Sequence, residues 1–194
     1  LERLIGDEAV GPKADRARAY HALGSLLAVD GQPEAATAHL ERALALWREL
    51  DEPNRLLKTL ISLGIAYHHR HDTARAASVY DQCIAIARAL GDEVQLRGAL
   101  RNRATLAHAM RDYGLELALL RERLALLPED VTPERVRTLV NIACARNGLG
   151  EREAVKAGAS EALRLLAGIG MAMPDLVVLC HQLLGGLAFD EADY

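Results

Sequence analysis

The chain has 194 residues and a formal net charge of −4, and 51% of its residues are hydrophobic while 4% are aromatic. This length admits one domain with a sizeable core, or two small ones. The acidic balance excludes a strongly basic nucleic-acid-binding face over the chain as a whole, and the abundance of Ala, Leu and Arg favours helices over strands.

The cysteines and the apolar runs indicate the cellular compartment in which the protein is expected. Cys83, Cys144 and Cys180 lie far apart and form no C-x-x-C pair, which argues against a disulfide framework and fits a reducing compartment. No apolar run reaches the roughly eighteen residues that a membrane helix needs, and the first residues lack a signal-peptide pattern. We expect a cytoplasmic protein, or a piece of one, with no membrane contact.

Taken in chain order, the sequence begins with a segment that differs from the rest of the chain. Residues 1–12 are predicted to be the end of a preceding helix or a lead-in, because Ile5-Gly6-Asp7 resembles Leu90-Gly91-Asp92 further on. Residues 13–194 are predicted to form a single helical-repeat region.

The repeat is visible in two well-matched copies. Tyr20-x-x-Leu23-Gly24-x-x-Leu27 and Leu60-x-x-Leu63-Gly64-x-x-Tyr67 lie 40 positions apart, and each is followed by a second apolar helical pattern. Two weaker copies come next, with Arg103 in place of the usual Leu in the third. The expected helix pairs span about 17–52, 57–92, 97–130 and 136–170, and 174–190 is expected to be the first helix of a fifth pair.

The spacing has a physical interpretation. Gly24 and Gly64 stand where the two helices of a pair are expected to cross, and Gly185 takes the crossing position in the last copy. Stacked pairs then bury a continuous core between neighbours. Asp72 and Asp112 precede second helices and are predicted to be their N-caps.

This pattern resembles the tetratricopeptide repeat family, and the repeats of about 40 residues are similar to those of bacterial signal-transducing ATPases and transcriptional regulators. The resemblance implies an all-α fold, a right-handed superhelical solenoid of antiparallel helix pairs. It also implies binding through a concave groove lined by the first helix of each pair.

Transferring the inward positions of the family by spacing gives a set of candidate groove residues. They are Lys58, His68, Arg101, Asn102, Thr105, His108, Arg137 and Asn141. The wider inward set holds cations and amides and no carboxylate, so an acidic or C-terminal peptide fits its chemistry. The alternative is that these residues are ordinary solvated side chains.

Other chemistry finds little support. The cluster from His68 to Asp72 includes three histidines, but a polar turn at a helix end explains it better than a metal site. No nucleophile elbow or phosphate loop is present, so no catalytic residue, metal or cofactor is predicted. The Arg-rich stretches are interleaved with Glu, and direct nucleic-acid binding by this segment is not expected.

The chain ends on a first helix without its partner. This indicates a fragment of a longer protein, and it makes the apolar residues Leu184, Leu187 and Phe189 candidates for a homodimer contact.

The functional expectation is a protein- or peptide-binding scaffold or sensor module of a larger regulatory protein, active in signalling or transcription regulation and not itself an enzyme. Two alternatives stay open: a homo-oligomerisation module, and an accessory domain of an enzyme whose catalytic part lies elsewhere.

Overall fold

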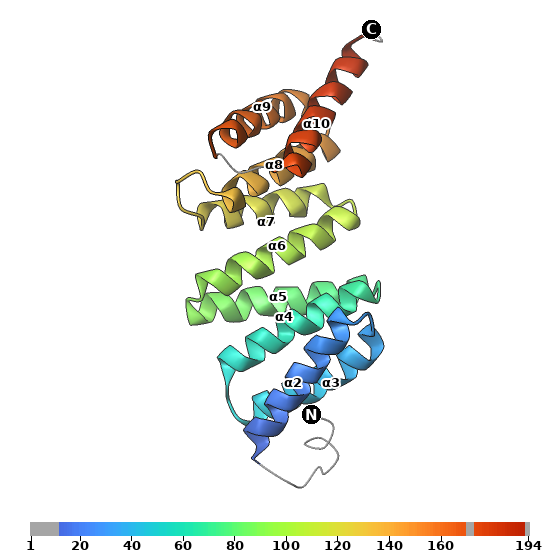
Figure 1. Cartoon of the computed structure of the whole chain (residues 1–194), viewed down its shortest axis with the longest axis vertical. Coiled ribbons are helices and arrows are strands. Elements are labelled where there is room, and N and C mark those ends of the chain that lie inside the picture. The colour runs from blue at the N-terminus through green and yellow to red at the C-terminus, as the bar shows by residue number, and fades with distance from the viewer. Residues whose placement is uncertain (1–11, 170–172, 193–194) are drawn as a thin grey trace. The chain divides into compact units, whose positions relative to one another are not determined.

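The computed structural model describes residues 12–169 and 173–192, and all secondary structure in these ranges is helical (Figure 1). The helices are α2 (Lys13–Val29), α3 (Pro33–Glu49), α4 (Pro53–His69), α5 (Thr73–Leu90), α6 (Glu93–Ala109), α7 (Tyr113–Ala125), α8 (Pro133–Gly148), α9 (Arg152–Ile169) and α10 (Pro174–Ala192). The predicted all-α class is confirmed. The segment expected to end a preceding helix, residues 1–12, lies almost wholly outside the described residues.

The chain forms two compact units, Leu1–Ala99 and Leu100–Tyr194, with the boundary inside α6. In the first unit, α2 packs on α3, α3 on α4 and α4 on α5. In the second unit, α7 packs on α8, α8 on α9 and α9 on α10. Within each unit, helices that follow one another in the sequence therefore pack together, as expected of stacked helical pairs.

Glycine permits the close crossing of the helices in the first two pairs. A Cβ added to Gly24 would lie 2.7 Å from Leu40 Cγ, and one added to Gly64 would lie 2.5 Å from Tyr80 Cε1. Both distances are too short for carbon atoms in contact, so these two positions need glycine. Gly185 differs, because a Cβ there would meet nothing within 4 Å among the described residues. A helix crossing at Gly185 therefore stays a prediction.

The turns inside the helix pairs repeat at the same interval. Gly31, His71 and Arg111 all have left-handed backbone conformations, with φ of 74°, 58° and 58°, and they lie 40 positions apart. Gly150, with φ of 74°, takes this place in the fourth turn one position early. The shared conformation shows that the 40-residue period extends to the backbone, even where the residue type changes from Gly to His or Arg.

The two predicted N-caps are confirmed. The carboxylate of Asp72 accepts a hydrogen bond from the backbone N–H of Arg75 at 3.2 Å, and that of Asp112 accepts one from Leu115 at 3.1 Å. Each satisfies an N–H group that the first turn of a helix leaves without a partner.

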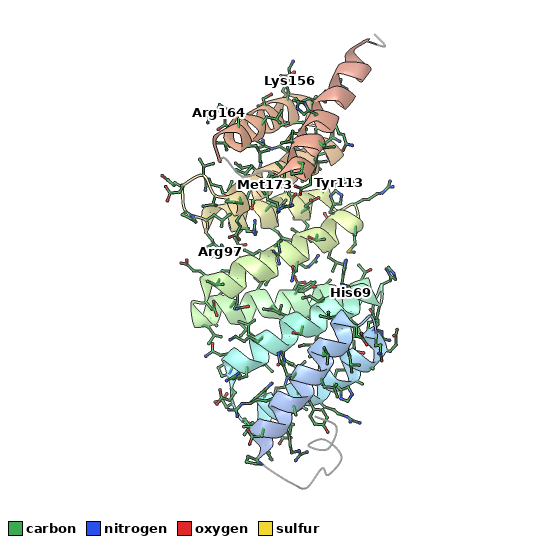
Figure 2. The ribbon with its side chains drawn as sticks, viewed as in Figure 1. His69, Arg97, Tyr113, Lys156, Arg164 and Met173 are labelled. Atoms are coloured by element: carbon green, nitrogen blue, oxygen red, sulfur yellow. The ribbon has the colours of Figure 1, made fainter. Side chains whose placement is uncertain are left out.

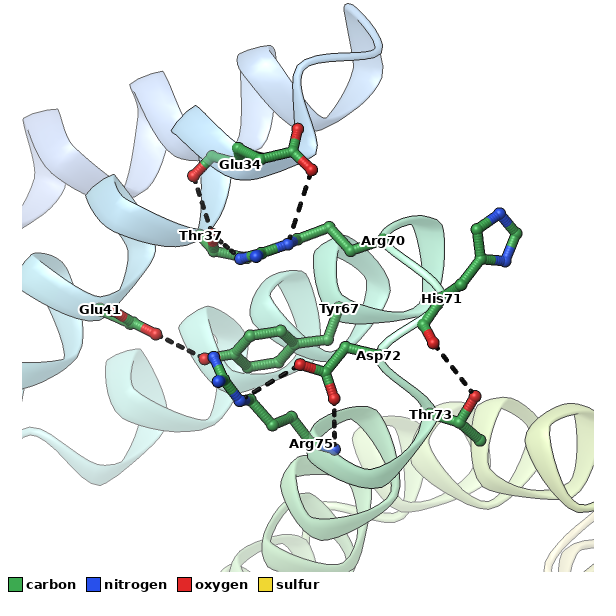
Figure 3. Close-up of polar contacts among 9 residues, drawn as sticks. All are labelled: Glu34, Thr37, Glu41, Tyr67, Arg70, His71, Asp72, Thr73 and Arg75. Carbon is green, nitrogen blue, oxygen red and sulfur yellow. Dashed lines mark hydrogen bonds and ion pairs between the residues drawn. The ribbon is translucent and has the colours of Figure 1, made fainter.

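Polar side chains also join the first helix pair to the second (Figure 3). Arg70, which follows α4, donates to Thr37 Oγ1 at 2.9 Å and lies 3.7 Å from a carboxylate oxygen of Glu34. The Tyr67 hydroxyl donates to Glu41 at 2.5 Å. Because Thr37, Glu34 and Glu41 all belong to α3, these contacts fix the second pair against the last helix of the first.

Candidate functional site

The second unit contains a cleft of about 460 Å³ lined by residues of α6, α7, α8 and α10. Four of the eight predicted groove residues lie together in it: Arg101, Thr105, His108 and Asn141. We call this site the second-unit cleft. It joins side chains that are up to 40 positions apart in the sequence because α6 and α8 are first helices of successive pairs.

The lining of the cleft is amphipathic. Its apolar part includes Leu120, Leu179 and Leu183, which come from α7 and α10. Asn147 adds a second amide from the end of α8. The arrangement offers apolar contact area beside hydrogen-bonding groups, which is the usual composition of a site that binds a small molecule or a peptide side chain.

A buried carboxylate, which the sequence pattern did not indicate, lies in the same cleft. Glu116 is 4% exposed, and its Oε2 lies 2.9 Å from Nδ1 of His108. Burial raises the pKa of Glu116, and the hydrogen bond with His108 acts in the opposite direction. The repeat register carried the signal, because Glu116 stands 40 positions after Ala76, a small residue at the helix crossing.

The same register shows a second buried charge. Arg123 stands 40 positions after the buried Cys83 and is itself 4% exposed. Its guanidinium donates to the hydroxyl of Thr138 and lies 2.6 Å from a carboxylate oxygen of Glu134. The third copy therefore has charged residues where the second copy has small ones. Of these charged residues, Arg123 is paired with residues of α8.

One wall of the cleft is formed by close aromatic packing. Tyr113, the first residue of α7 (labelled in Figure 2), places its ring so that a Cβ added to Gly148 would lie 2.5 Å from it. The ring centroid of His108 lies 5.8 Å from that of Tyr113, at an angle of 69° between the planes. His108 is thus held by a hydrogen bond on one side and by an edge-to-face contact on the other.

Cys144 lines the cleft but is poorly suited to nucleophilic chemistry. Burial, together with the carboxylate of Glu116, raises the pKa of the Cys144 thiol to about 11. The thiol is therefore protonated at neutral pH, whereas a nucleophilic cysteine needs its thiolate form.

The other four predicted groove residues lie outside the cleft. Arg137 forms an ion pair with Asp175 at 3.0 Å, so α10 supplies it with a carboxylate. Lys58 lines a small pocket of the first unit. Asn102 and His68 line neither pocket, and the His68 ring lies 6.3 Å from that of His69, which Figure 2 labels.

The residues considered for a homodimer contact belong in part to the core of the second unit. Leu187 is buried and Leu184 packs against the same cluster of α8, α9 and α10. The side chain of Phe189 lies outside the described residues. A dimer contact through these residues stays a prediction.

The histidine-rich turn does not converge on a common point. Helix α4 ends at His69, and the His71 ring points away from the neighbouring polar side chains in Figure 3. Asp72 is engaged as an N-cap. The described residues contain no group of three or more His, Cys, Asp or Glu side chains arranged to hold a metal ion. Within the same ranges, no helix combines the length and apolarity needed to cross a membrane.

These features define a helical-repeat protein whose repeats are built from helix pairs. Residues 15–89, from α2 to α5, match the tetratricopeptide repeat family, so this part of the chain consists of tetratricopeptide repeats. No curated protein matches the chain.

Solved structures of low sequence identity share the fold. The apo form of RapI matches with a TM-score of 0.75 at 12% identity, over 84% of this chain and 45% of RapI. A putative kinesin light chain with TPR-like repeats from Podosopora anserina matches with a TM-score of 0.74 at 17% identity, over 95% of this chain and 98% of that one. A signal transduction ATPase with a tetratricopeptide repeat sensor, PH0952 from Pyrococcus horikoshii, matches with a TM-score of 0.73 at 12% identity, over 86% of this chain and 26% of that one.

The chain thus covers less than half of the RapI chain and about a quarter of the PH0952 chain. The tetratricopeptide repeat fold implies a scaffold for protein–protein interaction, and proteins built from such repeats are generally not enzymes.

Proposed function

We propose that this chain is a peptide-binding module of a larger regulatory protein and that the second-unit cleft is its binding site. The observation that carries the proposal is the convergence of Arg101, Thr105, His108 and Asn141 in one cleft with an apolar lining. Each of these polar groups belongs to α6 or α8, the helices from which the family resemblance leads us to expect ligand contacts.

The chemistry of the cleft suits an extended segment with one apolar anchor. An apolar side chain of the ligand would lie against Leu179 and Leu183, where it is removed from water. The amide of Asn141 has both a donor and an acceptor, so it pairs with a peptide group of the ligand backbone. Arg101 offers a planar pair of donors to a carboxylate.

The charge distribution argues against a strongly acidic ligand. Glu116 lies within the cleft, and Arg137 already has a carboxylate partner in Asp175. A run of acidic residues in the ligand would be repelled by Glu116, and Arg137 would not be available to pair with it. We therefore propose a ligand with an apolar anchor and a single acidic group beside Arg101.

The regulatory setting is suggested by one structure of similar fold, PH0952. PH0952 is a signal transduction ATPase with a tetratricopeptide repeat sensor, and RapI shares the same repeat fold. At 12% identity these likenesses concern the fold, so a sensor role in signalling or transcription regulation is part of the proposal. A homo-oligomerisation module or an accessory domain of an enzyme are the alternatives.

A displayed library of random linear peptides tests the proposal. We expect the selected peptides to share one apolar residue near one acidic residue, and to lose about 10-fold or more in affinity for Asn141→Ala and Arg101→Ala. The matched controls are Asn102→Ala and Arg121→Ala, which remove the same groups outside the cleft. A library that yields no binding peptide, or peptides equally sensitive to the control variants, would contradict this site.

A further inference from the structure

A small pocket in the first unit has a chemistry unlike that of the second-unit cleft. It has a volume of about 150 Å³ and lies among α2, α3 and α4. We call it the basic pocket. Its lining residues are Arg18, His21, Trp47, Arg55, Lys58 and Thr59. None of them is a carboxylate.

Two of its cations have no counter-charge among the described residues. Arg18 is paired with Asp15 at 2.7 Å, but Arg55 and Lys58 form no ion pair with any residue in the described ranges. Both side chains are exposed at the rim, so they are free to turn toward a ligand. The pocket therefore keeps about two positive charges available.

A buried donor without an acceptor lies in the same lining. Trp47 is 3% exposed, and its indole nitrogen Nε1 has no hydrogen-bond partner in the described part of the chain. The nitrogen is itself buried, so Trp47 forms part of the pocket wall and its N–H is not assigned a contact with a ligand.

The other polar groups of the pocket, Thr59 and His21, are held in place by hydrogen bonds. The hydroxyl of Thr59, which is 1% exposed, donates to the carbonyl of Arg55 at 2.9 Å and lies 3.0 Å from Nδ1 of His21. Because the Thr59 hydrogen is already used, Nδ1 of His21 is the donor in that contact. These contacts fix Thr59 and His21, and the guanidinium and ammonium groups of Arg55 and Lys58 supply only donors.

From these observations we infer that the basic pocket binds a phosphate group, free or as a monoester, through Arg55 and Lys58. A phosphate monoester carries about −1.5 to −2 charges at neutral pH and three acceptor oxygens, which match the two available cations. A carboxylate carries one charge and leaves the second cation uncompensated. The volume admits one such group, whereas pockets for drug-sized ligands measure about 300–1,000 Å³.

This inference does not depend on peptide binding in the second-unit cleft, because the two sites share no residue. The variants that test one site leave the other unchanged. Failure of the phosphate proposal can therefore be distinguished from failure of the peptide-binding proposal.

Trp47 provides a direct readout, because it is the single tryptophan of the sequence. We would titrate the full chain with inorganic phosphate at constant ionic strength and follow the tryptophan emission, with acetate and chloride in parallel. A phosphoserine-containing tripeptide forms a second arm. The tighter of the two phosphate ligands identifies the source as free phosphate or a phosphorylated side chain.

We expect a saturable change with phosphate that is absent with acetate and chloride. Arg55→Gln and Lys58→Gln should each weaken the apparent affinity by about 10-fold, because each removes a charge-assisted hydrogen bond. The control is Arg48→Gln, which removes a positive charge next to Trp47 in the sequence. Arg48 lies outside the pocket, so this substitution should leave the phosphate affinity unchanged.

Three outcomes would overturn the inference. The first is the lack of a saturable response to either phosphate ligand. The second is an equal response to acetate, which would indicate a site for any small anion. The third is an equal loss in Arg48→Gln, which would indicate general electrostatic attraction. Arg55 and Lys58 are exposed, so their substitution is expected to leave the fold intact, and circular dichroism checks this.

Discussion

Nδ1 of His108 lies 2.9 Å from Oε2 of Glu116, although the Glu116 carboxylate is almost fully buried and His108 is exposed. The pair joins the end of α6 to the first turn of α7 across the turn at Arg111. It places a titratable carboxylate inside the cleft that we propose as the binding site.

The buried carboxylate makes the stability of the protein depend on pH. Because burial raises the pKa of Glu116 in the folded state, the folded chain holds this proton more tightly than the unfolded chain does. The ordinary pKa of a glutamate, which applies in the unfolded chain, is about 4.3. The contribution of Glu116 to stability therefore falls as the pH rises from this value through the higher pKa of the folded state. Glu116→Gln should be more stable than the wild type near neutral pH, and the difference should shrink in acid.

Urea unfolding at several pH values measures this difference. Glu122→Gln changes a carboxylate of the same helix outside the cleft and serves as the control. A stability gain for Glu116→Gln that grows as the pH falls would contradict a raised pKa of Glu116.

The crossing glycines should be sensitive to a single added methyl group. Gly64→Ala places a Cβ about where the Tyr80 ring now lies, 2.5 Å from Cε1, and should destabilise the fold by about 1–3 kcal/mol. Gly98→Ala is the matched control, because it also lies inside a helix but would meet nothing within 4 Å. It should stabilise the chain by about 0.5–1 kcal/mol, since Ala is the better helix former. Thermal unfolding would show opposite shifts in the midpoint, and shifts of the same sign would be evidence against the crossing.

The N-cap at Asp72 can be separated from its ion pair with Arg75. Asp72→Ala removes both the cap and the charge and should cost about 1 kcal/mol of stability. Asp72→Asn keeps an acceptor for the Arg75 N–H and removes the charge, so it should cost much less. Chemical denaturation of both variants measures the difference. Equal losses would show that the ion pair, not the cap, stabilises the start of α5.

His21 should titrate below the ordinary histidine range. Burial lowers its pKa most, and the positive charges of Arg55 and Lys58 lower it further. Arg55→Gln should raise the pKa of His21 while leaving it below the ordinary value, because burial persists. A proton NMR titration of the His21 ring detects the shift, with Arg48→Gln as the control. An unchanged pKa in Arg55→Gln would mean that the guanidinium does not face the ring.

Much of the fold could be predicted from the sequence because the repeat imposes the same physical requirement several times. Gly24 and Gly64 report a close crossing, and the turns at Gly31, His71 and Arg111 keep both the interval and the backbone conformation. The 40-residue interval does not hold in the fourth repeat, because its turn, at Gly150, comes one residue early. Around Gly185 the sequence alone does not show which helix, if any, packs on the glycine.

The cleft was predicted only in part. Spacing placed Arg101, Thr105, His108 and Asn141 on the first helices of two successive pairs, because first helices repeat at a fixed interval, and all four line this cleft. Glu116 was missed, since a carboxylate at a position otherwise held by Ala looks like a degenerate repeat and not like a site residue. Arg137 was expected in the groove, but its pairing with Asp175 depends on the packing of α10 and cannot be predicted from local spacing.

A map of amide chemical-shift changes, recorded when a library-selected peptide is added to the isotope-labelled chain, is the sharpest test of the proposed binding site. We predict that the largest changes occur at Thr105, His108 and Asn141, and that Asn141→Ala abolishes them at the same peptide concentration. Changes confined to α9 and α10 away from the cleft, or changes that persist in Asn141→Ala, would contradict the assignment of the second-unit cleft as the peptide-binding site.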